Sequence, residues 1–185
     1  MIRTILEEGN PLLATPAREV TPEELLTDEV QAVIDDLVHT LHSTTGVGIS
    51  APQIGQLLRI CIVDKPLTVL VNPIITPMGT EEDTSWEGCL SVPGKRGEVR
   101  RFQTVRVQAV GRRGQKIDAV WTKFRAIVVQ HEADHLDGIL YTARATSTEA
   151  DTSLRSRADS SAEQPLAARE RVTGRKTFVI DSQSR

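Results

Sequence analysis

The sequence predicts an α+β protein, because its helix-like and strand-like patterns fall in separate stretches of the chain. One amphipathic helix is expected at about residues 28–42 and a second at about 123–136, and the apolar residues between them follow strand-like patterns. With 185 residues, the chain is long enough to enclose a core of its own and to leave a tail.

The N-terminal helix is predicted by apolar residues that recur at intervals of three and one, from Val30 to Leu41. Thr27 can cap its first turn, because a threonine oxygen accepts hydrogen bonds from the free N–H groups there. His39 and His42 lie mostly off the apolar stripe. We therefore interpret these two histidines as partly exposed helix residues and not as ligands.

Strand-like patterns bounded by turn-forming residues follow this helix. The two glycines of Gly111-Arg112-Arg113-Gly114 indicate a hairpin turn between the last two strands. The expected strands are Leu57–Val63, Val69–Ile75, Thr104–Val110 and Lys116–Trp121.

The second helix carries a stripe that is apolar until it reaches two histidines. A buried helix with two imidazoles on its apolar face requires a function for them. The stripe consists of Phe124, Ile127, Val128, His131 and His135.

From about residue 145 the composition changes to serine, threonine, alanine and charged residues, with Leu154 as the only large apolar side chain up to residue 163. Such a segment cannot bury enough apolar surface to offset the entropy lost on ordering. We expect a catalytic domain at residues 1–144 and a flexible polar tail at 145–185, in which Thr177–Ile180 could form a short strand.

The composition is that of a soluble globular protein, with 39% hydrophobic and 25% charged residues. No apolar run approaches the roughly 20 residues of a membrane span, and the N-terminus has no signal or transit peptide pattern. We therefore expect a cytoplasmic protein without membrane contact. Two cysteines cannot form a disulfide framework, and Cys61, within an apolar run, is expected to be a buried small residue.

The net charge of −3 is unevenly distributed. Residues 1–50 hold nine acids and two bases, whereas residues 95–125 hold ten bases and two acids. The basic stretch could meet a peptide carboxylate or RNA, but a solvated hairpin face is the simpler interpretation. With three Phe, two Trp and one Tyr for stacking on bases, we expect no specific nucleic-acid ligand.

The sequence His131-Glu132-Ala133-Asp134-His135 is the strongest local signal for chemistry. Residues four apart on a helix share a face, so both imidazoles can bind one metal ion. Glu132 is then held beside the metal without being a ligand, where it can take a proton from water.

The third ligand decides what kind of metal site this is. Tyr141 stands where a metzincin has its third histidine, and the nearest downstream glutamates, Glu149 and Glu163, lie in the polar stretch. Upstream, Cys89 sits in a glycine-containing polar loop, where its thiolate would be a good ligand. Two histidines and one cysteine leave a fourth position for water, as in catalytic sites.

A third segment, Gly46 to Gln53, combines two glycines with a proline and an amide. The glycines permit close approach of the backbone to a ligand, although an ordinary tight loop has the same composition. If the Gln53 side chain faces the metal, its amide could donate to a developing oxyanion.

Together these three segments resemble the signature motifs of the peptide deformylases, in the family's order. That family has a Gly-x-Gly-x-Ala-Ala-Pro-Gln loop, a Glu-Gly-Cys-Leu-Ser loop and a His-Glu-x-Asp-His helix. They correspond here to Gly46–Gln53, Glu87–Ser91 and His131–His135, and the resemblance covers roughly residues 2–144. Within the motifs only Ser50 departs, replacing an alanine, and Trp86 stands beside them where a small or acidic residue is common.

The resemblance implies antiparallel sheets packed around a central metal-binding helix, and an enzyme that hydrolyses the formyl group from N-terminal formyl-methionine. Cys89, His131 and His135 would hold one divalent ion, Fe²⁺ first, with Zn²⁺, Ni²⁺ or Co²⁺ as alternatives. Glu132 would act as general base. The Gln53 amide and the backbone N–H of Leu90 would stabilise the oxyanion, together with the metal.

The resemblance also assigns the substrate contacts. An apolar pocket for the methionine side chain would be lined by Val47, Phe124, Ile127 and Val128, and the backbone at Gly46, Val47 and Gly48 would pair with the extended peptide. An ion pair between Glu87 and Arg101 would brace the Cys89 loop.

The expected partners are formyl-methionyl peptides of nascent chains, with transient ribosome contact, and we expect a monomer. Two rivals are a metallopeptidase that cuts internal bonds, which predicts no role for Cys89, and an inactive relative that binds formylated peptides or uses the metal for stability.

Overall fold

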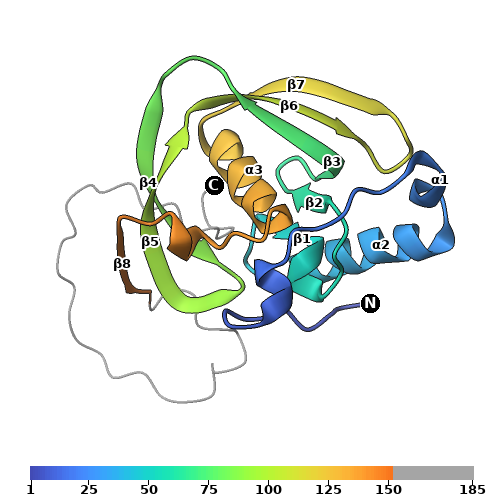
Figure 1. Ribbon diagram of the computed structural model, residues 1–185, viewed down its shortest axis with the longest axis horizontal. Helices are drawn as coiled ribbons and strands as arrows, with labels where there is room; N and C mark the ends of the chain where they lie inside the picture. The colour runs from blue at the N-terminus through green and yellow to red at the C-terminus, as the bar shows by residue number, and fades with distance from the viewer. Residues whose placement is uncertain (152–185) are drawn as a thin grey trace.

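The computed structural model describes residues 1–151, in which helices and two antiparallel sheets form an α+β fold (Figure 1). This confirms the predicted fold class. The larger sheet has five strands in the order β1-β2-β3-β6-β7, and the smaller one has three in the order β4-β5-β8. The strands are β1 Gly48–Ser50, β2 Ile60–Val63, β3 Thr68–Pro77, β4 Glu82–Cys89, β5 Val92–Phe102, β6 Thr104–Val110, β7 Lys116–Thr122 and β8 Ser147–Ala150.

Two long helices account for most of the helical structure in the described residues, and both have the predicted bounds. They are α2 Asp28–His42 and α3 Lys123–Leu136. A short helix, α1 Pro22–Leu25, precedes α2, and single 3-10 turns occur at Pro11–Ala14, Ala51–Ile54 and Tyr141–Ala143. None of the helices in the described part of the chain has the length and apolar character to cross a membrane.

The α2 helix packs one face on the larger sheet. Its apolar stripe, with Ile34, Leu37 and Leu41 fully buried, joins a core cluster with Ile49 of β1 and Ile62 of β2. The opposite face is polar, as its periodicity requires.

The α3 helix lies in the middle of the described part of the chain, with strands on more than one side of it (Figure 1). Val128, Val129 and Leu136 pack in a second cluster that includes Val107 of β6 and Cys61 of β2. Cys61 is fully buried, as predicted, and its thiol is free. Because α3 is surrounded, nearly every residue of its last two turns is buried, and this is where the histidines lie.

The β4–β5 hairpin was not predicted from the sequence. Its strands pair over most of their length, from Glu82 with Phe102 to Gly88 with Arg96. Exposed charged residues and glycines interrupt the apolar alternation that marks a strand, so the stability of this hairpin comes from the ladder and from a few buried side chains such as Val99.

The predicted strands differ from the observed ones mainly at their ends. β2 begins at Ile60 and not Leu57, because the main chain of Arg59 donates instead to Arg18 O at 2.8 Å. β3 continues to Pro77 and bulges between Val71 and Ile74, a departure that apolar periodicity does not reveal.

The folded part continues beyond residue 144, where the sequence analysis ended the catalytic domain. β8 pairs with β5 from Ser147 opposite Glu98 to Ala150 opposite Lys95. Arg96 binds Glu149, and the Asp151 N–H donates to Gly94 O at 2.8 Å. The strand is polar and exposed, so the amino-acid composition of this segment does not predict it. Residues 152–185, with the expected strand at Thr177–Ile180, lie outside the described residues.

The basic stretch of residues 95–125 is largely paired with carboxylates. Arg101 is buried, and most other pairs lie at the surface, where charges of both signs alternate. This arrangement favours the interpretation as a solvated face. The surface pairs are Lys95–Glu8, Arg96–Glu149, Arg100–Glu82, Arg106–Asp118 and Arg112–Asp35.

Candidate metal centre

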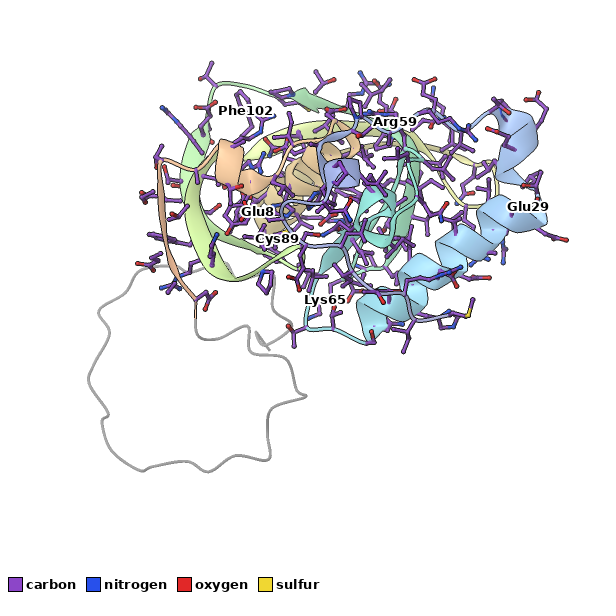
Figure 2. All side chains as sticks on the ribbon, turned by 60° about the horizontal axis from the view of Figure 1, so that its bottom comes forward. Glu8, Glu29, Arg59, Lys65, Cys89 and Phe102 are labelled. Atoms are coloured by element: carbon purple, nitrogen blue, oxygen red, sulfur yellow. The ribbon has the colours of Figure 1, made fainter. Side chains whose placement is uncertain are left out.

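Three side chains with metal-binding donor atoms meet between the end of β4 and the last turns of α3. They are Cys89, His131 and His135, whose donor atoms all lie within 4.8 Å of one another. Cys89 Sγ is 3.3 Å from His135 Nε2. All three side chains are buried, and Cys89 lies toward the interior of the folded part in Figure 2. The structure therefore brings together the three predicted ligands.

The hairpin places Cys89 by a shift in its ladder. Regular pairing ends at Gly88, and Cys89 then pairs with Val92 across a tight turn. The Ser91 N–H donates to Cys89 Sγ at 3.4 Å.

Glu87 fixes the orientation of His131. Its Oε2 lies 2.8 Å from His131 Nδ1, and its two oxygens accept from Arg101 at 2.8 and 3.0 Å. Burial by itself would raise the pKa of Glu87, but the hydrogen bonds from Arg101 and His131 outweigh that effect and lower it to about 2. The ionised carboxylate holds the proton of His131 on Nδ1 and leaves Nε2 as the ligand atom.

Arg101 and Asp134 extend this network from the hairpin to α3. Arg101 Nη1 donates to Asp134 Oδ2 at 2.6 Å, and Arg144 donates to both oxygens of Asp134 at 2.7 Å. The predicted pair of Glu87 and Arg101 is present, and through Asp134 it ties the strand that carries Cys89 to the helix that carries the histidines.

The donor set fits a divalent transition metal. Two imidazole nitrogens and one thiolate suit Zn²⁺ and Fe²⁺ better than the hard cations that prefer oxygen ligands. Beside the donors is a cavity of about 10 Å³, lined by Gly48, Gln53, Gly88, Cys89, Leu90, His131 and Glu132. This volume suits about one water molecule.

The pKa values of the two histidines are shifted in opposite directions. In the metal-free chain burial would lower the pKa of His131, but its contacts with Cys89 and Glu87 outweigh burial and raise it well above its usual value. Burial lowers the pKa of His135. A metal ion would therefore compete with a proton for His131.

Glu132 is buried beside the three donors. Burial raises its pKa to about 7, opposed by the charge of His131 and by a hydrogen bond from Ser50. Ser50 Oγ lies 2.6 Å from Glu132 Oε2. On the other side, a Cβ added to Gly48 would lie 2.3 Å from Glu132 Oε1, so any larger residue there would displace the Glu132 carboxylate.

Gln53 is held with its amide nitrogen toward the cysteine. Its Oε1 accepts from the Ser50 N–H at 2.8 Å, and its Nε2 lies 3.1 Å from Ser91 Oγ and 3.6 Å from Cys89 Sγ. In this orientation the Gln53 Nε2 group can donate a hydrogen bond at the cavity. Leu90, half-buried, lines the same cavity.

The residues expected to contact the methionine side chain lie deeper in the protein. Val47 and Val128 belong to the core cluster around α3, and Ile127 is buried. Phe124 is half-buried and packs against the same cluster. None of the four is among the residues that line the small cavity, so their role as a substrate pocket stays a prediction.

Sequence reasoning assigned no role to three polar residues of the site. Ser50 contacts Glu132, Ser91 contacts Gln53, and Asp134 joins the arginines. All three lie inside the quoted motifs, and Ser50 is the position that departs from the family pattern. Their partners are far away in sequence, so no local pattern could have identified them.

Comparison with known proteins gives a consistent result. A family model described as "Polypeptide deformylase" matches residues 2–151. Peptide deformylase 1 of Nitrosomonas europaea is 42% identical over 156 residues, which cover 78% of this chain and 88% of the relative. Peptide deformylase 2 of Pseudomonas syringae is 42% identical over 158 residues, covering 79% and 88%.

Solved structures agree with these relatives. An actinonin-bound crystal structure of class I type b peptide deformylase from Acinetobacter baumannii has a TM-score of 0.75 and 36% identity, covering 79% of this chain and 99% of that one. A peptide deformylase from Legionella pneumophila has a TM-score of 0.73 and 34% identity, covering 79% and 87%.

Proposed function

The chain belongs to the peptide deformylase family, and we infer from this premise that it hydrolyses the formyl amide at the N-terminal formyl-methionine of nascent polypeptides, releasing formate. It is a metal-dependent hydrolase that takes part in N-terminal processing of proteins. The observation that carries the proposal is that the cluster of Cys89, His131 and His135 adjoins a small cavity lined also by Glu132 and Gln53.

Cys89, His131 and His135 would hold one divalent ion, with the fourth position open toward the cavity. The bound ion would act as a Lewis acid that polarises the formyl oxygen and lowers the pKa of water. Fe²⁺ is the first assignment, by resemblance to the family, and Zn²⁺, Ni²⁺ and Co²⁺ are the alternatives. Neighbouring Glu87 would keep His131 in the tautomer that this role requires.

Glu132 would serve as the general base. Its carboxylate takes a proton from the attacking water, and the same group then gives the proton to the departing α-amine as the carbon–nitrogen bond breaks. A pKa raised by burial to about 7 suits both steps, because a group with a pKa near the working pH can accept and donate.

Gln53 and Leu90 would stabilise the oxyanion that forms on the formyl oxygen. The Gln53 Nε2 group lies 3.6 Å from Cys89 Sγ, and both Gln53 and Leu90 line the cavity. Removing one such donor typically lowers kcat by about 10²–10³.

Substrate binding would use the edge of the larger sheet. β1 is the terminal strand of the order β1-β2-β3-β6-β7, so the backbone at Gly46, Val47 and Gly48 can pair with an extended peptide. The apolar groups at Phe124, Ile127 and Val128 would receive the methionine side chain after small side-chain movements.

The protein would act in the cytoplasm as a monomer, in transient contact with the ribosome, because its substrate is the emerging N-terminus of a new chain. The inferred catalytic unit would include β8 and would therefore extend beyond residue 144.

The test is formate release from a formyl-Met-Ala-Ser peptide by protein purified without oxygen and loaded with Fe²⁺. The parent is compared with Glu132→Ala, with metal content measured in both. We expect formate from the parent and at least a hundredfold lower kcat in the variant at equal metal content. A folded, metal-loaded parent that releases no formate would contradict the proposal.

Cys89→Ser separates this function from its rivals. A deformylase with Cys89 as ligand should lose activity, an endopeptidase with a downstream ligand should keep its activity, and a metal-stabilised binding protein should lose stability without having had activity.

A further inference from the structure

We propose that Ser50 is a positioning residue that holds the Glu132 carboxylate in the orientation needed for proton transfer. The inference rests on the proposed function and adds a residue whose side chain that function does not use. It concerns the position at which the chain departs from the family motif.

The hydroxyl of Ser50 and the carboxylate of Glu132 form a short, fully buried contact. Ser50 ends β1 and has no solvent exposure, and Glu132 is 1% exposed. The Oγ–Oε2 distance is 2.6 Å, typical of a hydroxyl that donates to a charged oxygen. The hydroxyl therefore orients this oxygen from the side of β1.

The other carboxylate oxygen is confined from the opposite side. Glu132 Oε1 lies so near the α-carbon of Gly48 that a Cβ there would be 2.3 Å away. Ser50 and Gly48 both belong to β1, two residues apart, so they point to the same face of the strand. One strand thus fixes Oε2 by a hydrogen bond and Oε1 by close contact at the cavity that both Gly48 and Glu132 line.

Ser50 also links the base to the oxyanion donor. Its backbone N–H donates to Gln53 Oε1 at 2.8 Å and so turns the amide nitrogen toward Cys89. Any residue would supply that N–H, but only the hydroxyl reaches Glu132. The alanine of the family motif would leave Glu132 Oε2 without this donor.

A second contact offers a purely structural explanation. Ser50 Oγ also lies 3.0 Å from the main-chain oxygen of Glu132, but a hydroxyl has one proton and cannot donate to both oxygens. The main-chain oxygen lies within α3, where the N–H group four residues later in the helix can donate to it. The shorter contact with the ionisable oxygen is therefore the stronger one, and the two explanations predict different effects of removing the hydroxyl.

The test compares the parent with Ser50→Ala and with Ser85→Ala as a matched control. Ser85 is also buried, in β4 four residues before Cys89, and its hydroxyl has no hydrogen-bond partner among the described residues. Both changes remove one buried oxygen. We expect Ser50→Ala to lower kcat for the formylated peptide about tenfold, which corresponds to about 1.4 kcal/mol, with KM within twofold. Ser85→Ala should leave both constants within twofold.

Metal content, the unfolding midpoint and a crystal structure accompany the kinetics. The proposal expects Ser50→Ala to bind metal like the parent and to show the Glu132 carboxylate rotated or in more than one orientation. A kcat within twofold of the parent, an equal loss in Ser85→Ala, or a lowered unfolding midpoint without loss of kcat would overturn it.

If Ser50→Ala does not fold, Ser50→Cys replaces it. The thiol is a weaker donor of similar size and should lower kcat about threefold, and an unchanged kcat would overturn the proposal. A parent without activity would instead contradict the proposed function.

Discussion

At the scale of single residues, the site depends on groups whose protonation is set by burial and by one or two partners. Glu87 and Glu132 illustrate this. Both are buried carboxylates, yet Glu87 accepts from Arg101 and His131, which lower its pKa to about 2, whereas burial raises the pKa of Glu132 to about 7. The two carboxylates therefore suit different roles, one as a fixed negative charge and one as a proton carrier.

The raised pKa of Glu132 predicts a pH-dependent stability in the metal-free protein. Its folded pKa of about 7 exceeds the usual value of 4.5 for a glutamate, so the folded state binds the proton more tightly than the unfolded state does. The resulting stabilisation is complete below about pH 4.5 and is lost as the pH rises through 7. A shift of this size corresponds to roughly 3 kcal/mol.

Urea unfolding of metal-free parent and Glu132→Gln at pH 5 and pH 8 measures this effect. The uncharged amide of the variant does not titrate. From pH 5 to pH 8 the free energy of unfolding should therefore fall more in the parent than in Glu132→Gln. Parallel pH dependence of the two proteins would show that Glu132 does not titrate in this range.

At the scale of elements, the ion-pair network joins the hairpin to α3. Arg101 of β5 binds Glu87 of β4 and Asp134 of α3, and all three side chains are buried. The two elements that carry the predicted metal ligands are thus held together by charges that burial protects from water.

Arg101→Ala should therefore destabilise the protein strongly. Removing the guanidinium leaves Glu87 and Asp134 as buried carboxylates with fewer partners, which typically costs about 3–5 kcal/mol. Arg106→Ala is the control, because its pair with Asp118 lies at the surface, where water screens the charges and the loss of stability should be small. Free energies of unfolding in urea give both values, and equal effects would contradict the distinction.

The β8 strand leads to a prediction about the end of the catalytic unit. A chain that stops at residue 144 lacks the pairing of β8 with β5, the ion pair of Arg96 with Glu149 and the buried Asp151. We expect it to have a lower unfolding midpoint than a chain that stops at residue 151. Equal midpoints in thermal unfolding would place the boundary at residue 144, as the composition suggested.

At the scale of the whole molecule, the metal centre joins parts of the chain that are far apart in sequence. Cys89 comes from the smaller sheet, whereas the two histidines come from the helix that packs on the larger one. A metal ion bound at this junction should hold the two sheets together, because binding to the folded state alone stabilises it.

Removal of the metal should therefore lower the unfolding temperature. At a free metal concentration of a hundred times Kd, binding adds about 2.7 kcal/mol to the free energy of unfolding. Differential scanning calorimetry with and without a chelator measures the shift. Cys89→Ser should show a smaller shift, and an unchanged midpoint in the parent would contradict the predicted ligand set.

The sequence by itself determined the α+β class, both long helices with their bounds, and the three motifs that identify the family. These features are local: helical periodicity, capping residues and the spacing of histidines four apart are encoded in neighbouring residues. The same local patterns and the family resemblance predicted Cys89, His131 and His135 as metal ligands and Glu132 as the general base.

Only the tertiary structure decided what depends on contacts between distant segments. The β4–β5 hairpin and β8 form through main-chain hydrogen bonds that polar sequences make as readily as apolar ones, so their composition did not mark them. The contacts of Ser50 with Glu132 and of Arg101 with Asp134 join residues more than 30 positions apart. Side chains so far apart in sequence acquire fixed distances only when the core packs, and those distances set the protonation and orientation of the catalytic groups.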